Sequence, residues 1–65
     1  MTITVNGHKR QVRARDLAEL LHELHHDGTG VATARNHEFV RAVDRAKTLL
    51  QEGDEIEIVT PQQGG

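Results

Sequence analysis

Short runs of alternating apolar and polar residues mark the two clearest strands of this chain. Residues 2–5 are all β-branched and alternate in character along the run, and residues 55–60 alternate in the same way. An alternation with a period of two predicts half-buried β-strands. The first run ends at Asn6-Gly7, and both of these residues tolerate the positive φ angles of a type I′ turn. The sequence therefore predicts a hairpin whose second strand covers residues 8–13.

This hairpin places one charged residue on the apolar side of the sheet. A two-residue turn aligns the inward positions of the two strands, which are Ile3, Val5, His8, Arg10 and Val12. Arg10 can lie with its aliphatic stem along the edge of the core and its charge in water. In the final strand, Ile56 and Ile58 are the residues expected to point inward.

A helix is predicted at about residues 16–26. Asp16 is a good N-cap residue, and Glu19 follows three residues later in a capping-box arrangement. Four leucines then recur with helical spacing and form one apolar stripe: Leu17, Leu20, Leu21 and Leu24. Gly28 is the residue expected to take the left-handed conformation at the C-cap.

The remaining elements are short. We expect strands at 31–35 and 38–40, a turn at 36–37, an ambiguous helical stretch at 43–50 and a tight turn at 52–54. The apolar residues that suit a helical turn in the ambiguous stretch are Val43, Ala46, Leu49 and Leu50. Pro61 has no N–H group to donate, so it should end the last strand or place it at an edge.

The chain is long enough for one small α+β domain. Its 65 residues can bury only a thin core, which predicts one sheet face packed on roughly one helix. We expect residues 1–60 to form the domain and residues 61–65, which have nothing to bury, to form a flexible tail. A core of this size leaves no room for a large pocket, so an independent enzyme is the least expected function.

Composition excludes several classes of function. The net charge is −2 and Phe39 is the only aromatic residue, which disfavours nucleic-acid binding. The N-terminus has no apolar segment for secretion or membrane insertion, and the absence of cysteine fits a reducing compartment, so we expect a cytoplasmic protein. Acidic residues cluster at 52–57, where they either face a basic partner or form a solvated strand face.

The residues most suggestive of chemistry are the last two, Gly64 and Gly65. By composition, a terminal glycine pair arises by chance in roughly 0.5% of chains. A tail without side chains can thread a narrow channel and present its carboxylate to a nucleotide for activation as an acyl-adenylate. Taken alone, the pair favours a tail without function. Taken with the final strand and Pro61, which hold the tail away from the domain, it favours an activated carboxylate.

The sequence resembles the ThiS family of thiamine-biosynthesis sulfur carriers over essentially its full length. The matching segments are Ile3–Gly7, Asp16–Leu21, Gly30–Ala32, Gly53–Val59 and Gly64-Gly65. The last two segments are the most specific. The resemblance implies a ubiquitin-like β-grasp fold, a mixed four- or five-stranded sheet packed on one main helix, in which the final strand pairs with the first one in the middle of the sheet. It also implies that Gly65 is the modified residue and that Gly64 enters the partner enzyme with it.

The same resemblance implies partners and a reaction. An E1-like adenylyltransferase of the ThiF type would use ATP to adenylate Gly65, and a persulfide would supply the sulfur of a thiocarboxylate. A thiazole synthase of the ThiG type would then take that sulfur. The chain contains no Walker-type loop, so we expect no cofactor of its own and ATP bound by the partner.

Four positions depart from the family pattern. His37 follows Asn36 where the family has glycine, and Arg41 stands in place of the proline of a valine-proline-arginine stretch. Arg45 occupies the place of an aromatic residue, and Arg10 an apolar one. These positions lie away from the tail, so they affect the assignment of the partner more than the chemistry of Gly65.

Three histidines near the predicted end of the helix pose a separate question. His22 and His26 have the spacing to share a helix face and bind a metal ion. The alternative is a solvated helix end, where His25 and its neighbours interact favourably with the helix dipole. Because the pattern places no third ligand, we assign no metal site.

Other functions stay open at this point. A carrier for molybdopterin or another sulfur pathway has the same Gly-Gly end. Proteins of a different class, a tag joined to lysines by isopeptide bonds or a plain interaction module with an inert tail, are compatible with the same fold. In every case we expect the free chain to be a monomer.

Overall fold

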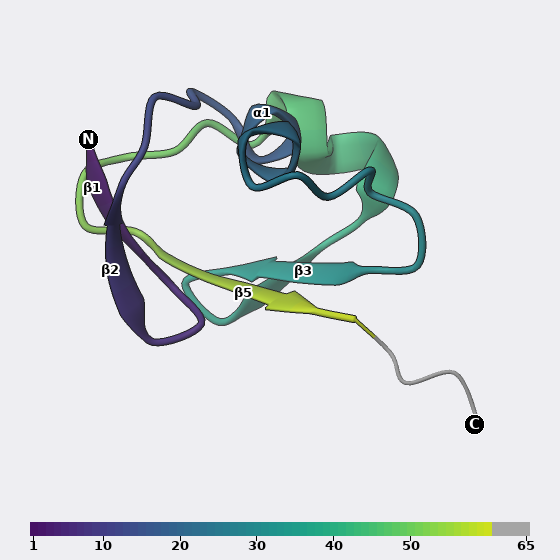
Figure 1. Ribbon diagram of the computed structural model, residues 1–65. Helices are drawn as coiled ribbons and strands as arrows, with labels where there is room; N and C mark the ends of the chain where they lie inside the picture. The colour runs from purple at the N-terminus through teal and green to yellow at the C-terminus, as the bar shows by residue number, and fades with distance from the viewer. Residues whose placement is uncertain (61–65) are drawn as a thin grey trace.

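The computed structural model describes residues 1–60. The elements, in chain order, are β1 (Thr2–Val5), β2 (His8–Gln11), α1 (Leu17–Glu23), β3 (Ala32–Arg35), β4 (Glu38–Val40), the 3₁₀-helix η1 (Ala42–Lys47) and β5 (Glu55–Val59). Helices α1 and η1 both lie on one side of the sheet (Figure 1). No helix within this range is long and apolar enough to cross a membrane.

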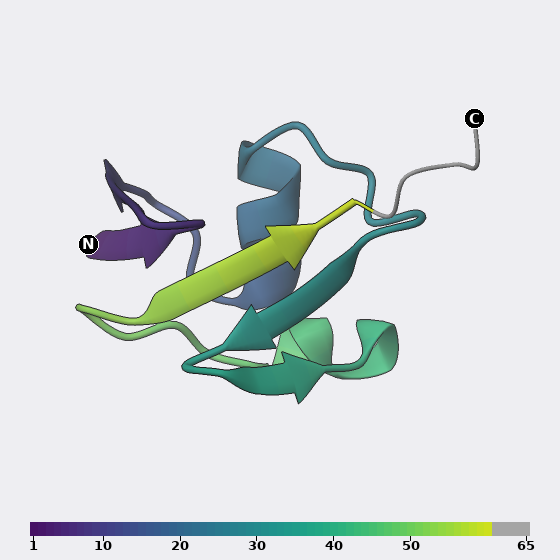
Figure 2. The same ribbon diagram turned by 90° about the horizontal axis from the view of Figure 1, so that it is seen from below.

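The sheet has five strands in the order β2-β1-β5-β3-β4. The hairpins β1–β2 and β3–β4 are antiparallel, β5 runs antiparallel to β3, and β5 runs parallel to β1. Figure 2 shows β5 between β1 and β3, so the last strand of the chain is the central strand of the sheet. One helix packed on a mixed sheet of this order is the β-grasp arrangement, which confirms the fold expected from the sequence.

Both hairpins turn through two residues with positive φ. Asn6 and Gly7 have φ angles of 50° and 85°, as a type I′ turn requires. Asn36 and His37 have φ angles of 50° and 72°, so the second hairpin uses the same geometry with a histidine in the second position. A glycine takes that conformation without steric cost, whereas His37 does not. The predicted turns are confirmed.

The helix begins as predicted but ends earlier. The Asp16 carboxylate accepts a hydrogen bond from the Glu19 N–H at 2.8 Å, and Glu19 in turn accepts from the Arg15 N–H at 2.9 Å. The last helical residue is Glu23 and not residue 26. His25, at φ 67°, takes the left-handed position predicted for Gly28.

The early end of the helix follows from a Schellman-type arrangement of hydrogen bonds. The His25 N–H donates to the His22 carbonyl at 3.0 Å, and the His26 N–H donates to the Leu21 carbonyl at 2.8 Å. Histidine is among the few residues enriched in left-handed conformations, so the chain can turn here without glycine. His26 consequently lies outside the helix.

The core lies between the sheet and α1. Its buried apolar residues are Ile3, Val5, Val12, Ala14, Leu17, Leu20, Leu21, Leu50, Ile56 and Ile58. The inward residues predicted for the first and last strands are therefore confirmed. His8 and Arg10 on β2 are exposed, because β2 is an edge strand and their side chains reach solvent there.

The stretch at 43–50, which the sequence left ambiguous, forms the 3₁₀-helix η1 over Ala42–Lys47, and its apolar residues are mostly not buried. Val43, Ala46 and Leu49 are exposed, and Leu50 alone of the four apolar residues is buried. The residue of η1 that points inward is Arg45, which is only 7% exposed. A 3₁₀-helix has three residues per turn, so its inward face differs from that of an α-helix. The aliphatic stem of Arg45 takes the place of an apolar side chain.

Candidate functional site

The two residues that sequence reasoning singled out for chemistry, Gly64 and Gly65, lie outside the described residues, as does Pro61. The structure instead shows how the chain is held up to the point from which these residues follow. Strand β5 pairs with β1 at Thr4 and Val5. It also pairs with every residue of β3, from Ala32 to Arg35. The beginning of β5 is therefore held on both sides by backbone hydrogen bonds, and its pairing with β3 continues to Val59.

Asp54 organises the beginning of β5. The residue is 6% exposed, and its carboxylate accepts hydrogen bonds from Arg35 Nε at 2.8 Å, Asn36 Nδ2 at 3.1 Å and the Gln51 N–H at 2.8 Å. Asn36 Oδ1 also accepts from the Glu55 N–H at 2.9 Å. These contacts join the loop before β5 to the β3–β4 turn and set where β5 enters the sheet.

The same contacts decide the ionisation of Asp54. Burial is the largest single influence and raises the pKa of the carboxyl group, because it disfavours the charged form. The hydrogen bonds from Arg35, the Gln51 N–H and Asn36, together with the charge of Arg35, act in the opposite direction. Their sum prevails and holds the pKa of Asp54 below its ordinary value. Asp54 is therefore a buried carboxylate whose charge contributes to stability.

The side of the sheet opposite α1 carries an apolar patch. We call Ala32, Ala34, Phe39 and Val59 the outer-face patch. Ala34 pairs with Phe39, and Ala32 pairs with Val59, so the four residues lie together on three neighbouring strands. Phe39 is 69% exposed and Val59 57% exposed. Large apolar side chains gathered on an open sheet face are typical of a surface that docks a protein partner.

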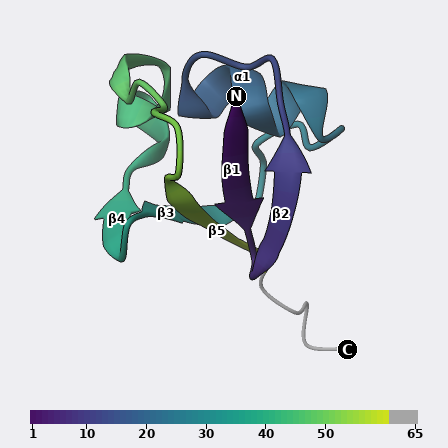
Figure 3. The same ribbon diagram turned by 90° about the vertical axis from the view of Figure 1, so that its left-hand side faces the viewer.

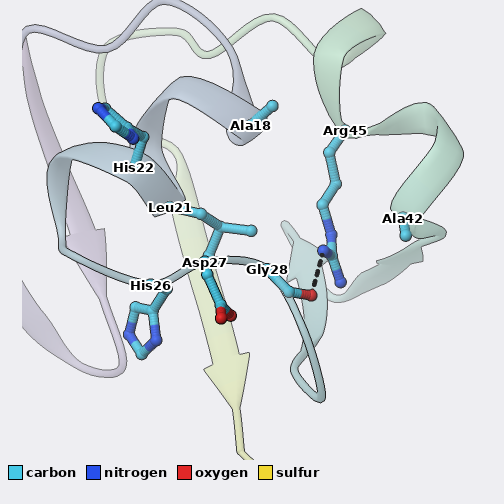
Figure 4. Close-up of a pocket in the computed structure, with 8 residues that line it drawn as sticks. All are labelled: Ala18, Leu21, His22, His26, Asp27, Gly28, Ala42 and Arg45. Atoms are coloured by element: carbon cyan, nitrogen blue, oxygen red, sulfur yellow. Dashed lines mark hydrogen bonds between the residues drawn. The ribbon is translucent and has the colours of Figure 1, made fainter.

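A hollow of about 480 Å³ lies on the other side of the sheet, between α1, the loop after it and η1. Its lining residues are drawn in Figure 4: Ala18, Leu21, His22, His26, Asp27, Gly28, Ala42 and Arg45. The His22 ring is directed away from His26, so the early end of the helix separates the two histidines that the spacing had placed on one face. Among residues 1–60, no three His, Cys, Asp or Glu side chains are grouped closely enough to hold a metal ion.

Arg45 closes one wall of this hollow and has a structural role. Its guanidinium donates to the Gly28 carbonyl at 3.1 Å, the Val31 carbonyl at 2.8 Å and the Thr33 hydroxyl at 3.2 Å. These bonds tie the loop between α1 and β3 to η1. Each of the three guanidinium nitrogens therefore has a hydrogen-bond acceptor, as buried polar groups require. The departure from an aromatic residue at this position therefore replaces packing by hydrogen bonds.

The other departures lie at the surface. His37 Nε2 lies 3.0 Å from a carboxylate oxygen of Glu55, and Arg41 Nε donates to Asp44 at 2.9 Å. Arg10 lines a shallow depression beside Val5. Each of these side chains is exposed, so none of the three departures changes the core.

Sequence reasoning missed the side-chain roles of three turn residues. Asn6, Asn36 and Asp54 were identified as turn residues. The side chains of Asn6 and Asn36 also bond β5, and the carboxylate of Asp54 accepts bonds from Arg35, Asn36 and the Gln51 N–H. A signal was available at both hairpins, because asparagine and not glycine occupies the first turn position of each. Asparagine tolerates a positive φ and in addition carries a donor and an acceptor.

Known proteins match this arrangement along the whole chain. The topology, with a central last strand, defines the chain as a ubiquitin-like β-grasp protein. The model of the ThiS family matches residues 3–65, and the chain belongs to that family.

Individual relatives match as well. A protein of Thermus thermophilus described as sulfur carrier protein ThiS is 32% identical over 63 residues, which cover 97% of this chain and 98% of that protein. The crystal structure of a thiamine biosynthesis protein (ThiS) from Geobacter metallireducens superposes with a TM-score of 0.85 at 28% identity and full coverage of both chains. The solution structure of a thiamine biosynthesis protein from the same organism gives 0.80 at 28% identity, covering all of this chain and 88% of the other.

Asp54→Asn should lower the free energy of unfolding at neutral pH by about 1–3 kcal/mol, because the substituted amide leaves donors of Arg35 or Gln51 without a charged acceptor. A depressed folded-state pKa gives stability that is present above the pKa of the unfolded chain, about 4, and is lost as the pH falls below it through the folded pKa. Urea denaturation at several pH values should show that acid lowers the free energy of unfolding less for the variant than for the wild type. Equal losses would contradict this role of Asp54.

Proposed function

We propose that the chain is a sulfur carrier of thiamine biosynthesis that works through the C-terminal carboxylate of Gly65. The observation that supports this most strongly is the central position of β5 in a chain of the ThiS family, since it fixes the segment that leads into Gly64-Gly65. The relatives described as thiamine-biosynthesis and sulfur carrier proteins favour the thiamine pathway over a molybdopterin pathway. In this role the chain is a co-substrate of other enzymes.

The chemistry proceeds in three steps. A carboxylate oxygen of Gly65 attacks the α-phosphate of ATP, and pyrophosphate leaves. The terminal sulfur of a partner's persulfide then displaces AMP and forms an acyl disulfide. Finally a partner thiol attacks the disulfide, which releases the Gly65 thiocarboxylate and leaves the oxidised pair of sulfurs on the partner. The chain has no cysteine, so the persulfide and the thiol both belong to partners.

The partners divide the remaining work. An E1-like adenylyltransferase of the ThiF type binds ATP and activates Gly65, and a thiazole synthase of the ThiG type accepts the sulfur. The carrier needs no cofactor of its own, and the use of ATP places the reaction in the cytoplasm. Gly65 is the modified residue, and Gly64 enters the partner's active centre with it because neither has a side chain to obstruct the approach.

The outer-face patch is the surface that docks the adenylyltransferase. Val59 belongs to this patch and precedes Gly65 by six residues, a length of chain that spans at most about 20 Å. One partner can therefore contact the patch and the carboxylate at the same time. Glu55 and Glu57 are exposed on the same strand, so the surface of the partner around its apolar contact should be basic.

Gly65→Ala should leave folding unchanged and slow adenylation by about tenfold or more, because a methyl group crowds the carboxylate in the nucleotide site. The assay is pyrophosphate release with the host's ThiF-type adenylyltransferase and ATP, and Gln62→Ala serves as a tail control that should react as the wild type does. Equal rates for Gly65→Ala and wild type would contradict the threading of the tail. If the wild-type carrier releases no pyrophosphate, the proposed function itself is wrong.

Phe39→Ala should weaken binding to the adenylyltransferase by about tenfold or more, since large aromatic residues carry much of the energy of a protein interface. Val43→Ala is the matched control: Val43 is 71% exposed, like Phe39 at 69%, but lies on η1 on the other side of the sheet. Calorimetric titration should show normal affinity for this control and unchanged melting for both variants. Equal affinity of the two variants would exclude the outer face as the docking surface.

A further inference from the structure

The β1–β5 pairing ends before β5 does. The two parallel strands pair at Thr4 with Glu55 and at Val5 with Ile56. Beyond this point β1 turns away, because Asn6 and Gly7 form the hairpin turn. The last three residues of β5 consequently have no strand beside them on this side, although the pairing with β3 continues to Val59.

The side chain of Asn6 fills the place of the missing strand. Its Oδ1 accepts a hydrogen bond from the Ile58 N–H at 2.8 Å, and its Nδ2 donates to the Ile58 carbonyl at 3.1 Å. The Asn6 N–H also donates to the Ile56 carbonyl at 2.9 Å. A carboxamide has the same donor and acceptor as a peptide group, so Asn6 extends the hydrogen bonding of β1 by one further residue of β5.

Few other residues can do this. Aspartate keeps an acceptor but has no donor for the Ile58 carbonyl, and glycine suits the φ angle of 50° but has no side chain. The contact lies one residue before Val59, where the pairing of β5 with β3 ends, and Ile58 is the last buried residue among residues 1–60. In Figure 3, β5 runs behind the tip of the β1–β2 hairpin, and the two bonds of Asn6 join this tip to Ile58.

We propose that Asn6 is a positioning residue for the reaction of the tail: by holding both backbone groups of Ile58, it fixes the direction in which the chain leaves the sheet toward Gly65. The proposal rests on the proposed function. Without this contact, the end of β5 is held only by β3, and the partner must restrict a wider range of directions when it binds the carrier. This restriction makes the free energy of binding less favourable, so it raises the KM for the carrier and leaves kcat nearly unchanged.

Asn36 provides a matched control within the same molecule. It occupies the same position of an equivalent turn, also at φ 50°. Its carboxamide likewise makes two hydrogen bonds, accepting from the Glu55 N–H at 2.9 Å and donating to Asp54 Oδ1 at 3.1 Å. These contacts lie at the beginning of β5, at the far end from the tail. Asn36→Gly therefore removes a comparable contact and should weaken the fold without redirecting the tail.

The experiment compares the wild type with Asn6→Gly, Asn6→Asp and Asn36→Gly, at a temperature where all four are folded. Kinetics are measured with ATP and the host's ThiF-type adenylyltransferase, with the carrier as the varied substrate. Asn6→Gly should raise the KM for the carrier by about tenfold, and Asn36→Gly by less than about twofold. Asn6→Asp keeps one of the two bonds, so its KM should lie between those of the wild type and Asn6→Gly. Equal KM values for Asn6→Gly and Asn36→Gly would overturn the proposal.

Hydrogen exchange gives a second readout that needs no partner. The Ile58 amide should lose about tenfold or more of its protection in Asn6→Gly, beyond any change in global stability, and keep it in Asn36→Gly. Unchanged protection of Ile58 in Asn6→Gly would overturn the proposal even if the wild-type carrier were not adenylated. A wild-type carrier that is not adenylated would instead count against the proposed function, so the two failures are distinguishable.

Discussion

The rest of the structure depends on the pairing of β5 with two neighbours. Strand β5 hydrogen-bonds to β1 on one side and to β3 on the other, and its Ile56 and Ile58 lie in the core against α1. A strand at the edge of a sheet would be held on one side only. Because the last strand is central, the beginning of β5 is held on both sides by backbone hydrogen bonds, and its end is held by β3 and by the side chain of Asn6.

The two sides of the sheet have different roles. One side packs on α1 and η1 and carries the buried apolar residues that form the core. A domain of this size can bury only one such thin core. The other side carries the outer-face patch and the acidic residues of β5, and no helix among the described residues covers it. In the proposed function, stability and recognition are thus separated, because a partner that covers the outer face does not disturb the core.

Much of this fold could be predicted from the sequence, because local patterns determine it. The turn at Asn6-Gly7, the start of the helix at Asp16 and the inward isoleucines of β5 each follow from nearby residues, and each is confirmed. The candidate site, Gly64-Gly65, was found from the sequence alone and stays a prediction, since the structure describes residues 1–60.

Two of the features that could not be predicted depend on contacts between residues far apart in the chain, and a third, the early end of the helix, depends on an unusual residue directly after its C-cap. The guanidinium of Arg45 lies inside because carbonyls of the loop after α1 accept its hydrogen bonds, which no local pattern reveals. The helix ends at Glu23 because His25 takes a left-handed conformation for which glycine is the usual choice. The bond between Asn6 and Ile58 spans 52 positions, so only the assembled sheet shows it.

The most direct test of the central claim is the intact mass of the protein isolated from its native host, with the modified fraction mapped to the C-terminal peptide. Replacement of one oxygen of Gly65 by sulfur adds about 16 Da, and peptide mapping separates this from oxidation of Met1, which adds nearly the same mass. The account predicts a fraction of the protein with the added mass on Gly65. A C-terminal peptide that stays unmodified when ATP, a persulfide donor and the cognate adenylyltransferase are all supplied would contradict it.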